Sequence, residues 1–186
     1  MIRLFAGIAI PQPIKQSLTL LRGPIDGAHW VADENLHITL RFIGTLDPPL
    51  AEDVAISLGT VRFESFSLTP CGVGLFGTPE KPRLLYVGIE KDEALQKLHQ
   101  TIDRRLVDLG LSPENRTYTP HITLARMKGR SRRVANYLND HSLFKAPAFA
   151  VSRITLFQSH PGPHYQPVAD FPAIDATPDP GSGLMD

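Results

Sequence analysis

The tetrapeptide His-Ile-Thr-Leu occurs twice in this chain, at residues 37–40 and again at residues 121–124. Each copy alternates polar and apolar side chains and contains β-branched residues, which is typical of a strand. Successive side chains of a strand point to opposite faces, so His37 and Thr39 share one face, and His121 shares one with Thr123. A single copy would be explained by an ordinary strand with a surface or core histidine. Two identical copies in matching contexts favour a functional pair.

The order of elements around the two tetrapeptides also repeats. Each half reads as strand, helix, motif strand, helix and strand, beginning near Arg3 and near Arg83. The clearest helix spans 95–109, where apolar residues recur at spacings of three and four before Gly110. We therefore expect an α+β fold of two pseudo-twofold-related lobes, each an antiparallel sheet with helices packed outside. The active cleft would lie between the lobes. A parallel doubly wound sheet is not favoured, because no uniform run of βαβ units is present.

The repeat also sets the expected domain limits. We expect one bilobal domain over residues 1–175, with half-repeats at about 1–72 and 83–157, a closing strand at about 164–173, and a flexible tail over 176–186. Between the halves, residues 72–82 are rich in Gly and Pro and are expected to form a loop. Asp47 and Ser131 are expected to cap the helices that follow them.

The amino-acid composition excludes several classes of protein. The 186 residues include 19 Lys plus Arg and 19 Asp plus Glu, so net charge provides no overall attraction to nucleic acid or membrane. The single Cys71 excludes an intrachain disulfide and a cysteine-based zinc site. No apolar stretch approaches the roughly 20 residues of a membrane span, and the first residues do not resemble a signal peptide. We expect a cytoplasmic protein that does not contact membranes and is a monomer.

Two imidazoles and two hydroxyls on facing lobes indicate a particular chemistry. Histidine titrates near neutrality, so one imidazole can donate a proton while the other accepts one. Displacement at phosphorus needs both actions, on opposite sides of the phosphorus atom. Thr39 and Thr123 could donate hydrogen bonds to the non-bridging oxygens, where negative charge must be stabilised. Such a reaction requires no metal and no cofactor.

With these motifs in place, the sequence resembles the two-histidine (2H) phosphoesterases, and among them the RNA 2′,3′-cyclic phosphodiesterases, also named 2′-5′ RNA ligases. The resemblance extends to about residue 174 and includes the opening strand, the central segment and the closing strands. Its blocks are residues 3–11, 35–44, 72–77, 82–88 and 120–126, with Leu156, Ser159, Gly162, Pro163 and Tyr165.

The resemblance implies hydrolysis of 2′,3′-cyclic phosphodiester ends of RNA to 2′-phosphomonoesters, with reverse 2′-5′ ligation as a second activity. His37 would be the proton donor to the leaving 3′ oxygen, and His121 the proton acceptor that activates water. Thr39 and Thr123 would bind the phosphate. The residues alone do not distinguish acid from base, because the repeat makes the two histidines equivalent.

Other side chains are candidates for substrate binding. Arg41 shares the face of His37 by alternation, so it would meet RNA phosphate or solvent. Arg126 matches a family position near the site, but alternation from His121 requires a bulge to bring it there. Phe42 is expected in the core. Tyr86 and Tyr118 could stack on a terminal base, with a core or lining position as the alternative.

Residues 126–133 form the one dense basic segment of the chain. It is either a solvated loop or a contact for the RNA backbone. The partners expected from all these features are RNA ends, such as tRNA fragments or oligonucleotides, or small cyclic phosphates.

Two other functions remain open. The same chemistry could act on a small cyclic nucleotide or an ADP-ribose cyclic phosphate. A non-catalytic RNA-binding module would not need two titratable groups. The G-x-G-x-x-G pattern at 72–77 does not indicate dinucleotide binding, because prolines follow where a helix would have to start. His160 and His164 lack the helical spacing and acidic partner of a zinc protease.

Overall fold

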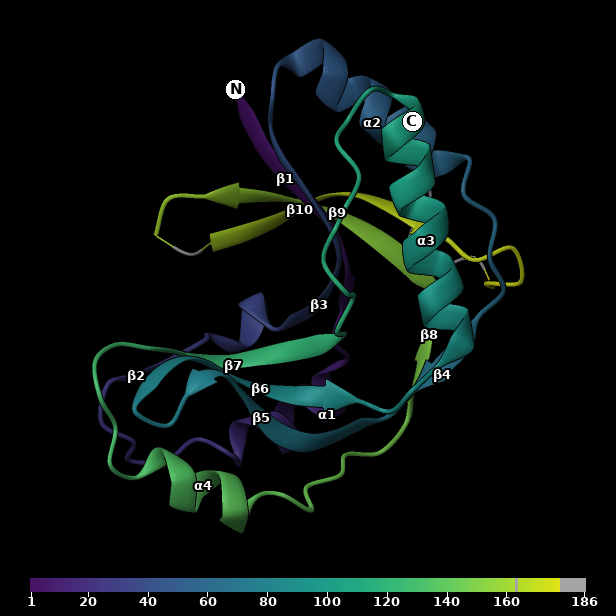
Figure 1. The fold of residues 1–186 in the computed structure, drawn as a ribbon. Coiled ribbons are helices and arrows are strands. Elements are labelled where there is room, and N and C mark those ends of the chain that lie inside the picture. The colour runs from purple at the N-terminus through teal and green to yellow at the C-terminus, as the bar shows by residue number, and fades with distance from the viewer. Residues whose placement is uncertain (163, 178–186) are drawn as a thin grey trace, which may run out of the picture.

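An antiparallel sheet of eight strands forms the centre of the computed structural model, which describes residues 1–162 and 164–177 (Figure 1). The strand order is β10-β9-β1-β3-β7-β6-β5, with β2 beside β7, and β4 pairs with β8 in a small second sheet. In chain order the elements are β1 (Ile2–Ala9), α1 (Gln12–Thr19), β2 (Ala28–Trp30), the 3-10 turn η1 (Asp33–Asn35), β3 (His37–Leu46), α2 (Pro48–Gly59), β4 (Phe66–Leu68), β5 (Pro70–Thr78), β6 (Lys81–Ile89), α3 (Glu93–Asp108), β7 (His121–Met127), α4 (Val134–Asp140), β8 (Phe149–Val151), β9 (Arg153–His160) and β10 (His164–Pro172).

The two motif strands, β3 and β7, lie side by side in the middle of this sheet. They pair at a single position, Ile38 opposite Ile122, and both side chains are completely buried. On one side of this joint lie β1, β9 and β10, and on the other lie β6, β5 and β2. Figure 1 shows α2 and α3 beside the first group and α4 beside the second. The expected α+β fold of two lobes with antiparallel strands is confirmed.

Each lobe contains elements from both ends of the chain. Strand β5 pairs with β6 in the second lobe, while β9 pairs with β1 in the first. Helix α3 follows β6 in sequence but packs on β3. The hydroxyl of Tyr137 in α4 donates to the carbonyl of Leu21, just after α1, at 2.8 Å. The half-repeats at about 1–72 and 83–157 remain a prediction about the sequence, and they do not coincide with the two lobes.

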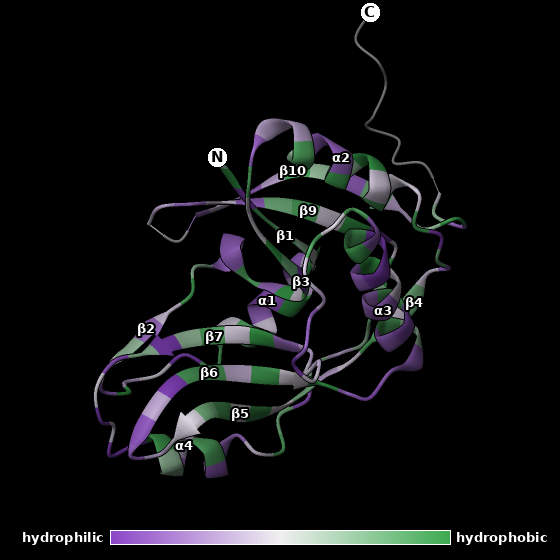
Figure 2. Ribbon diagram, turned by 45° about the horizontal axis from the view of Figure 1, so that its top comes forward, coloured by the Kyte–Doolittle hydropathy of each residue, from purple (hydrophilic) through white to green (hydrophobic). Residues whose placement is uncertain are grey.

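The amphipathic helix expected at 95–109 corresponds to α3. Its buried residues include Leu95, Leu98, Ile102 and Leu106. Hydrophobic and hydrophilic residues alternate along it in Figure 2, as the apolar spacing requires. Burial of this face against β3 and α2 holds the helix on the side of the sheet opposite the motif histidines.

The loop expected at 72–82 was wrong, because this stretch lies almost entirely in β5 and β6. Val73 and Leu75 pack against the core, which supplies the apolar contacts of a strand. The register shifts beside Gly72 and Gly77, whose φ angles are +67° and +97°. The glycines therefore allow irregularities within a strand, where a side chain would be strained.

One of the two expected helix caps is confirmed. The carboxylate of Asp47 accepts a hydrogen bond from the backbone N–H of Leu50 at 3.1 Å, at the start of α2. The cap expected at Ser131 was wrong. Helix α4 begins only at Val134 with Arg133 as its N-cap, and the buried Ser131 hydroxyl has no hydrogen-bond partner in the part of the chain that the structure describes.

No helix within residues 1–162 and 164–177 is long and apolar enough to cross a membrane. The tail expected from residue 176 lies outside the described residues from 178 onward.

The Ile38–Ile122 joint can be tested by truncation. Because both side chains are fully buried, Ile38→Ala or Ile122→Ala leaves a cavity and should lower the free energy of unfolding by about 2–5 kcal/mol. Urea denaturation followed by circular dichroism measures this loss. Ile56→Ala is the matched control, because Ile56 on α2 is 62% exposed. Equal losses in the joint and control variants would contradict the central role of the joint.

Candidate active site

The motif strands share a β-bulge at the same position. On β3, Thr39 pairs with Gly7 and Arg41 with the adjacent Ala6, so Leu40 is an extra residue. On β7, Thr123 pairs with Tyr86 and Ala125 with the adjacent Leu85, so Leu124 is extra in the same way. In each strand the bulged leucine and the residue after it are both buried. Simple alternation therefore fails after the third residue of each motif.

On β3 this bulge turns Arg41 away from the histidine. Arg41 is 8% exposed, and its Nε donates to the carboxylate of Asp103 at 2.6 Å. It also donates to the carbonyl oxygens of Phe42 and Ser112. The expected placement of Arg41 on the face of His37, toward RNA phosphate or solvent, was therefore wrong. Phe42, expected in the core, is 61% exposed and lies on the histidine face.

On β7 the same bulge brings Arg126 to the histidine face. Its guanidinium is exposed, and Nη2 lies 3.5 Å from the hydroxyl of Tyr165 on β10. The positive charge of Arg126 also acts on the imidazole of His37. The bulge that Arg126 requires in order to share a face with His121 is therefore present. Arg126 and Phe42 occupy equivalent positions in the two repeats.

The four motif side chains lie on one face of the sheet. Ile38 and Ile122 are opposite each other and buried, so their neighbours in each strand point the other way. The antiparallel direction brings His37 to the side of Thr123, and Thr39 to the side of His121. The two imidazoles are close enough for His121 to affect the pKa of His37.

Both imidazoles are held by the same local hydrogen bond. Nδ1 of His37 donates to the carbonyl of Asn35, and Nδ1 of His121 donates to that of Thr119, each at 2.7 Å. A carbonyl oxygen only accepts, so each Nδ1 carries the hydrogen and each neutral ring keeps its lone pair on Nε2. Nε2 of His37 lies 3.1 Å from the hydroxyl of Thr39. Both reactive nitrogens are thus fixed at Nε2.

Aromatic side chains surround each imidazole. The ring of His37 lies 4.8 Å from Phe5, 6.0 Å from Phe157 and 5.1 Å from Tyr165, between ring centroids. The ring of His121 lies 4.9 Å from Phe76 and 5.3 Å from Tyr86. The predicted site residue Tyr86 is therefore placed beside His121.

Tyr118 lies beneath the site. Its ring stacks on His99 with centroids 3.9 Å apart, and its hydroxyl donates to the backbone carbonyl of Thr39 at 3.0 Å. Nδ1 of His99 in turn donates to the carbonyl of the bulged Leu40 at 2.8 Å. Burial raises the pKa of Tyr118. This arrangement matches the lining position that was the alternative to base stacking, and it ties α3 to the bulge.

Burial lowers the pKa of both catalytic candidates. For His37 burial is the largest cause, the Asn35 carbonyl opposes it, and the charges of His121 and Arg126 lower the pKa further. For His121 burial again dominates, opposed by the Thr119 carbonyl. Both imidazoles are therefore mostly neutral at pH 7 in the free protein.

Sequence reasoning gave no site role to Asn35 or Tyr165. The carbonyl of Asn35 orients His37, and its side-chain Oδ1 accepts from the backbone N–H of Tyr165 at 3.2 Å. Tyr165 reaches His37 because β10 joins the first lobe through β9 and β1. Only the strand order supplies that contact. In the sequence, the local signal for Asn35 is its place two residues before a motif histidine.

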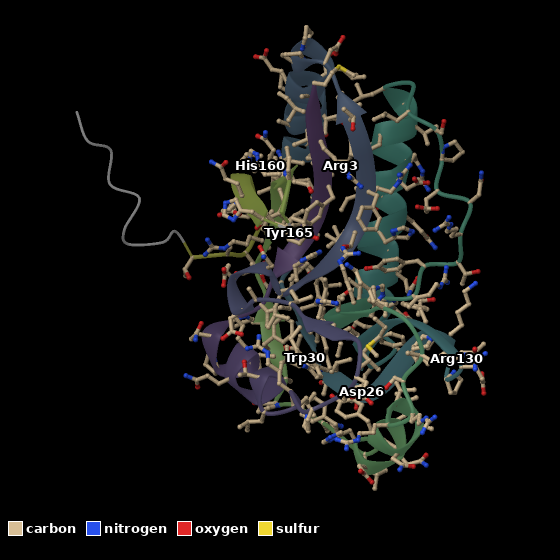
Figure 3. All side chains as sticks on the ribbon, turned by 90° about the vertical axis from the view of Figure 1, so that its left-hand side faces the viewer. Arg3, Asp26, Trp30, Arg130, His160 and Tyr165 are labelled. Atoms are coloured by element: carbon tan, nitrogen blue, oxygen red, sulfur yellow. The ribbon has the colours of Figure 1, made fainter. Side chains whose placement is uncertain are left out.

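The basic segment 126–133 begins at this face with Arg126 and continues beyond the end of β7 at Met127. Within the basic segment 126–133, Arg133 Nη1 donates to the carbonyl of Pro24 at 3.4 Å. Figure 3 shows Tyr165 and Arg130 on separate parts of the molecule, above and below the middle of the view. The described residues contain no group of three or more His, Cys, Asp or Glu side chains that could hold a metal ion.

The family model described as LigT like Phosphoesterase matches residues 8–86 and 87–165, one range for each half of the chain. The chain belongs to this family.

Relatives and a solved structure agree with that assignment. An RNA 2′,3′-cyclic phosphodiesterase of Aeropyrum pernix is 36% identical over 152 residues, covering 78% of this chain and 86% of the relative. A protein of the same name from Geobacillus stearothermophilus is 30% identical over 187 residues, covering 92% of this chain and 57% of that longer protein. The structure of E. coli LigT complexed with 3′-AMP has a TM-score of 0.76 at 23% identity, covering 93% of this chain and 98% of that one. The last comparison shows a shared fold.

The electrostatics of the site can be tested by titration. We expect the pKa values of His37 and His121, measured by NMR of the ring protons, to lie below the value of about 6.5 that is usual for a solvent-exposed histidine. Arg126→Gln should raise the pKa of His37, because removing a nearby positive charge favours the imidazolium. Arg105→Gln, on the exposed side of α3, is the control. A pKa of His37 that does not change in Arg126→Gln would contradict the placement of Arg126.

Proposed function

We propose that this protein hydrolyses 2′,3′-cyclic phosphodiester ends of RNA to 2′-phosphomonoesters by two-histidine acid–base catalysis. One observation carries the proposal. Two imidazoles on twofold-related strands are each fixed through Nδ1, so that both Nε2 atoms belong to one face of the sheet. The names of the relatives support the substrate class.

In the proposed reaction His121 is the general base. Its neutral Nε2 takes a proton from water as the water oxygen bonds to phosphorus. The bond from phosphorus to the 3′ oxygen then breaks, and the protonated Nε2 of His37 gives its proton to that oxygen. The products are a 2′-phosphate and a free 3′ hydroxyl, and one water molecule is consumed. Solvent exchange returns the two imidazoles to their starting states.

The surroundings of His37 suit a proton donor. Burial, with the charges of His121 and Arg126 as smaller causes, lowers the pKa of His37, and a lower pKa makes its imidazolium a stronger acid. The negative charge of a bound phosphate has the opposite sign and raises the pKa of both rings, so it favours protonation of one histidine in the complex. Assignment of the donor role to His37 follows the family pattern.

In this proposal the phosphate is bound by the hydroxyls of Thr39 and Thr123 and by Arg126. Thr39 and Thr123 can donate to the non-bridging oxygens, whose charge increases as the water oxygen adds. Arg126 lies on the same face and can pair with the same anion. The reaction requires no metal or cofactor, and we propose a cytoplasmic monomer that also catalyses the reverse 2′-5′ ligation.

Loss of activity in single variants tests this mechanism. With EDTA present, purified protein should convert an oligonucleotide ending in a 2′,3′-cyclic phosphate to one ending in a 2′-phosphate. His37→Ala and His121→Ala should each lower kcat by about 10²–10⁴, the usual contribution of a general acid or base. Thr39→Val and Thr123→Val should have smaller effects in the same direction. Product ends are identified by mass spectrometry after phosphatase treatment.

His141→Ala is the matched control, because His141 is the C-cap of α4, a helix that Figure 1 shows apart from β3 and β7. Full turnover in either motif-histidine variant would disprove the assigned roles. Hydrolysis of adenosine 2′,3′-cyclic monophosphate with no turnover of the oligonucleotide would instead favour a small cyclic phosphate as substrate.

The pH dependence provides a separate test. One histidine must be protonated and the other neutral, so kcat/KM should follow a bell-shaped curve. Its maximum lies between the two free-protein pKa values, and burial lowers both. The maximum should therefore fall below pH 6.5, while the profile of kcat shifts to higher pH because bound phosphate raises the pKa values. A kcat/KM profile that rises to a plateau above pH 7, in an assay limited by chemistry, would contradict the acid–base pair.

A further inference from the structure

A hollow of about 330 Å³ lies on the flank of the first lobe, at the beginning of β1. Its lining residues are Met1, Arg3, Thr45, Gln158, Ser159, His160 and Pro161. No carboxylate is among them, and each polar side chain in the set can donate a hydrogen bond. The guanidinium of Arg3 is exposed, and no described carboxylate pairs with it. This chemistry favours an anion.

A row of paired residues connects this hollow with the histidine site. Along β1 and β3 the opposed pairs are Ala9 with His37, Gly7 with Thr39, Phe5 with Phe42, and Arg3 with Thr45. Directly opposed residues share a face, and alternate residues of β1 share that same face. The two register shifts in this pairing preserve the row, because each skips one residue of β3. Arg3 and Thr45 therefore lie on the face that carries His37.

The spacing of this row suits an RNA chain. Gly7 and Arg3 are four residues apart on one strand, which corresponds to roughly 13 Å. A phosphate at the histidines and a second phosphate at Arg3 would belong to different nucleotides. Figure 3 shows Arg3 and His160 together above Tyr165, on the side of the molecule that faces the viewer.

An exposed aromatic ring lies between the two ends of the row. Phe42 is 61% exposed, and its ring centroid is 6.1 Å from that of Phe5. Proteins that bind single-stranded RNA stack unpaired bases on such rings. A base at Phe42 would lie between the cyclic phosphate and the hollow.

We propose that the hollow around Arg3 binds a backbone phosphate of the RNA upstream of the cyclic end, while Phe42 stacks on a base between the two phosphates. This inference rests on the proposed function. A cyclic phosphate closes the 3′ end of the chain, so every other phosphate lies on its 5′ side. The site therefore prefers an oligonucleotide to a cyclic mononucleotide.

The test compares two substrates, adenosine 2′,3′-cyclic monophosphate and the trinucleotide ApApA ending in a 2′,3′-cyclic phosphate. Arg3→Glu should raise KM for the trinucleotide about tenfold, because an attractive contact with phosphate becomes repulsive. KM for the mononucleotide and kcat for both should not change. Arg3→Gln should reduce the slope of log kcat/KM against log salt for the trinucleotide by about 0.7, the loss of one single-strand phosphate contact. Phe42→Ala should raise KM for the trinucleotide and leave KM for the mononucleotide unchanged.

Two further variants complete the design. Arg105→Glu reverses an exposed charge on α3, on the opposite side of the sheet, and should affect neither substrate. Arg130→Glu tests the basic segment 126–133. If Arg130→Glu selectively raises KM for the trinucleotide and Arg3→Glu does not, the RNA path follows the second lobe and the proposal is overturned. Equal effects of Arg3→Glu on both substrates would also overturn it.

The outcome separates this proposal from the proposed function. If wild-type protein cleaves both substrates and Arg3→Glu changes nothing, the function stands and the hollow has no role. If wild-type protein cleaves neither substrate, the proposed function fails. Fluorescence anisotropy with a labelled trinucleotide then tests whether the hollow binds RNA phosphate. Arg3→Glu should still weaken binding of the trinucleotide about tenfold. Equal binding by wild-type and Arg3→Glu protein would reject this role of the hollow.

Discussion

The pairing of Ile38 with Ile122 is the contact on which the site depends. It joins two antiparallel groups of strands into one sheet, and its two buried side chains determine which faces the neighbouring residues occupy. A shift of one residue in either strand would turn its histidine and threonine into the core. Two separate sheets would hold the same side chains without a fixed relation between them. One hydrophobic contact thus sets the relative position of the two motif histidines and the two motif threonines.

The bulges after the motifs introduce asymmetry into a nearly symmetric site. The two copies are identical for four residues and then differ, with Arg41 and Phe42 in the first and Ala125 and Arg126 in the second. Since the bulges match, the arginine of the first copy enters the core and pairs with Asp103, while that of the second faces the site. The positive charge of Arg126 therefore lies near His37, whereas the equivalent position of the other repeat holds the exposed aromatic ring of Phe42. This difference gives two equivalent histidines unequal surroundings.

Sequence patterns predicted the features that depend on local periodicity. The motif strands, α3 and the Asp47 cap follow from alternation, helical spacing and side-chain chemistry over a few residues. Arg41 and Phe42 were placed incorrectly, because a bulge changes the face of every following residue and leaves the sequence period looking regular. The stretch 72–82 was expected to be a loop because of its Gly and Pro content, but its glycines Gly72 and Gly77 lie at irregularities within a strand. The role of Tyr165 was not predictable by this route. Its contact with His37 depends on the pairing of strands more than 120 residues apart along the chain.

The exchange of β5 and β9 between lobes has a consequence for how the molecule is assembled. Neither lobe is a continuous piece of chain, so neither can complete its sheet until the other half has been synthesised. The first lobe must wait for β9 and β10 before its edge beside β1 is covered. An incomplete chain leaving the ribosome would expose that unpaired edge, which invites association with other chains. Because of this interleaving, the sheet of each lobe depends on strands from both halves of the chain.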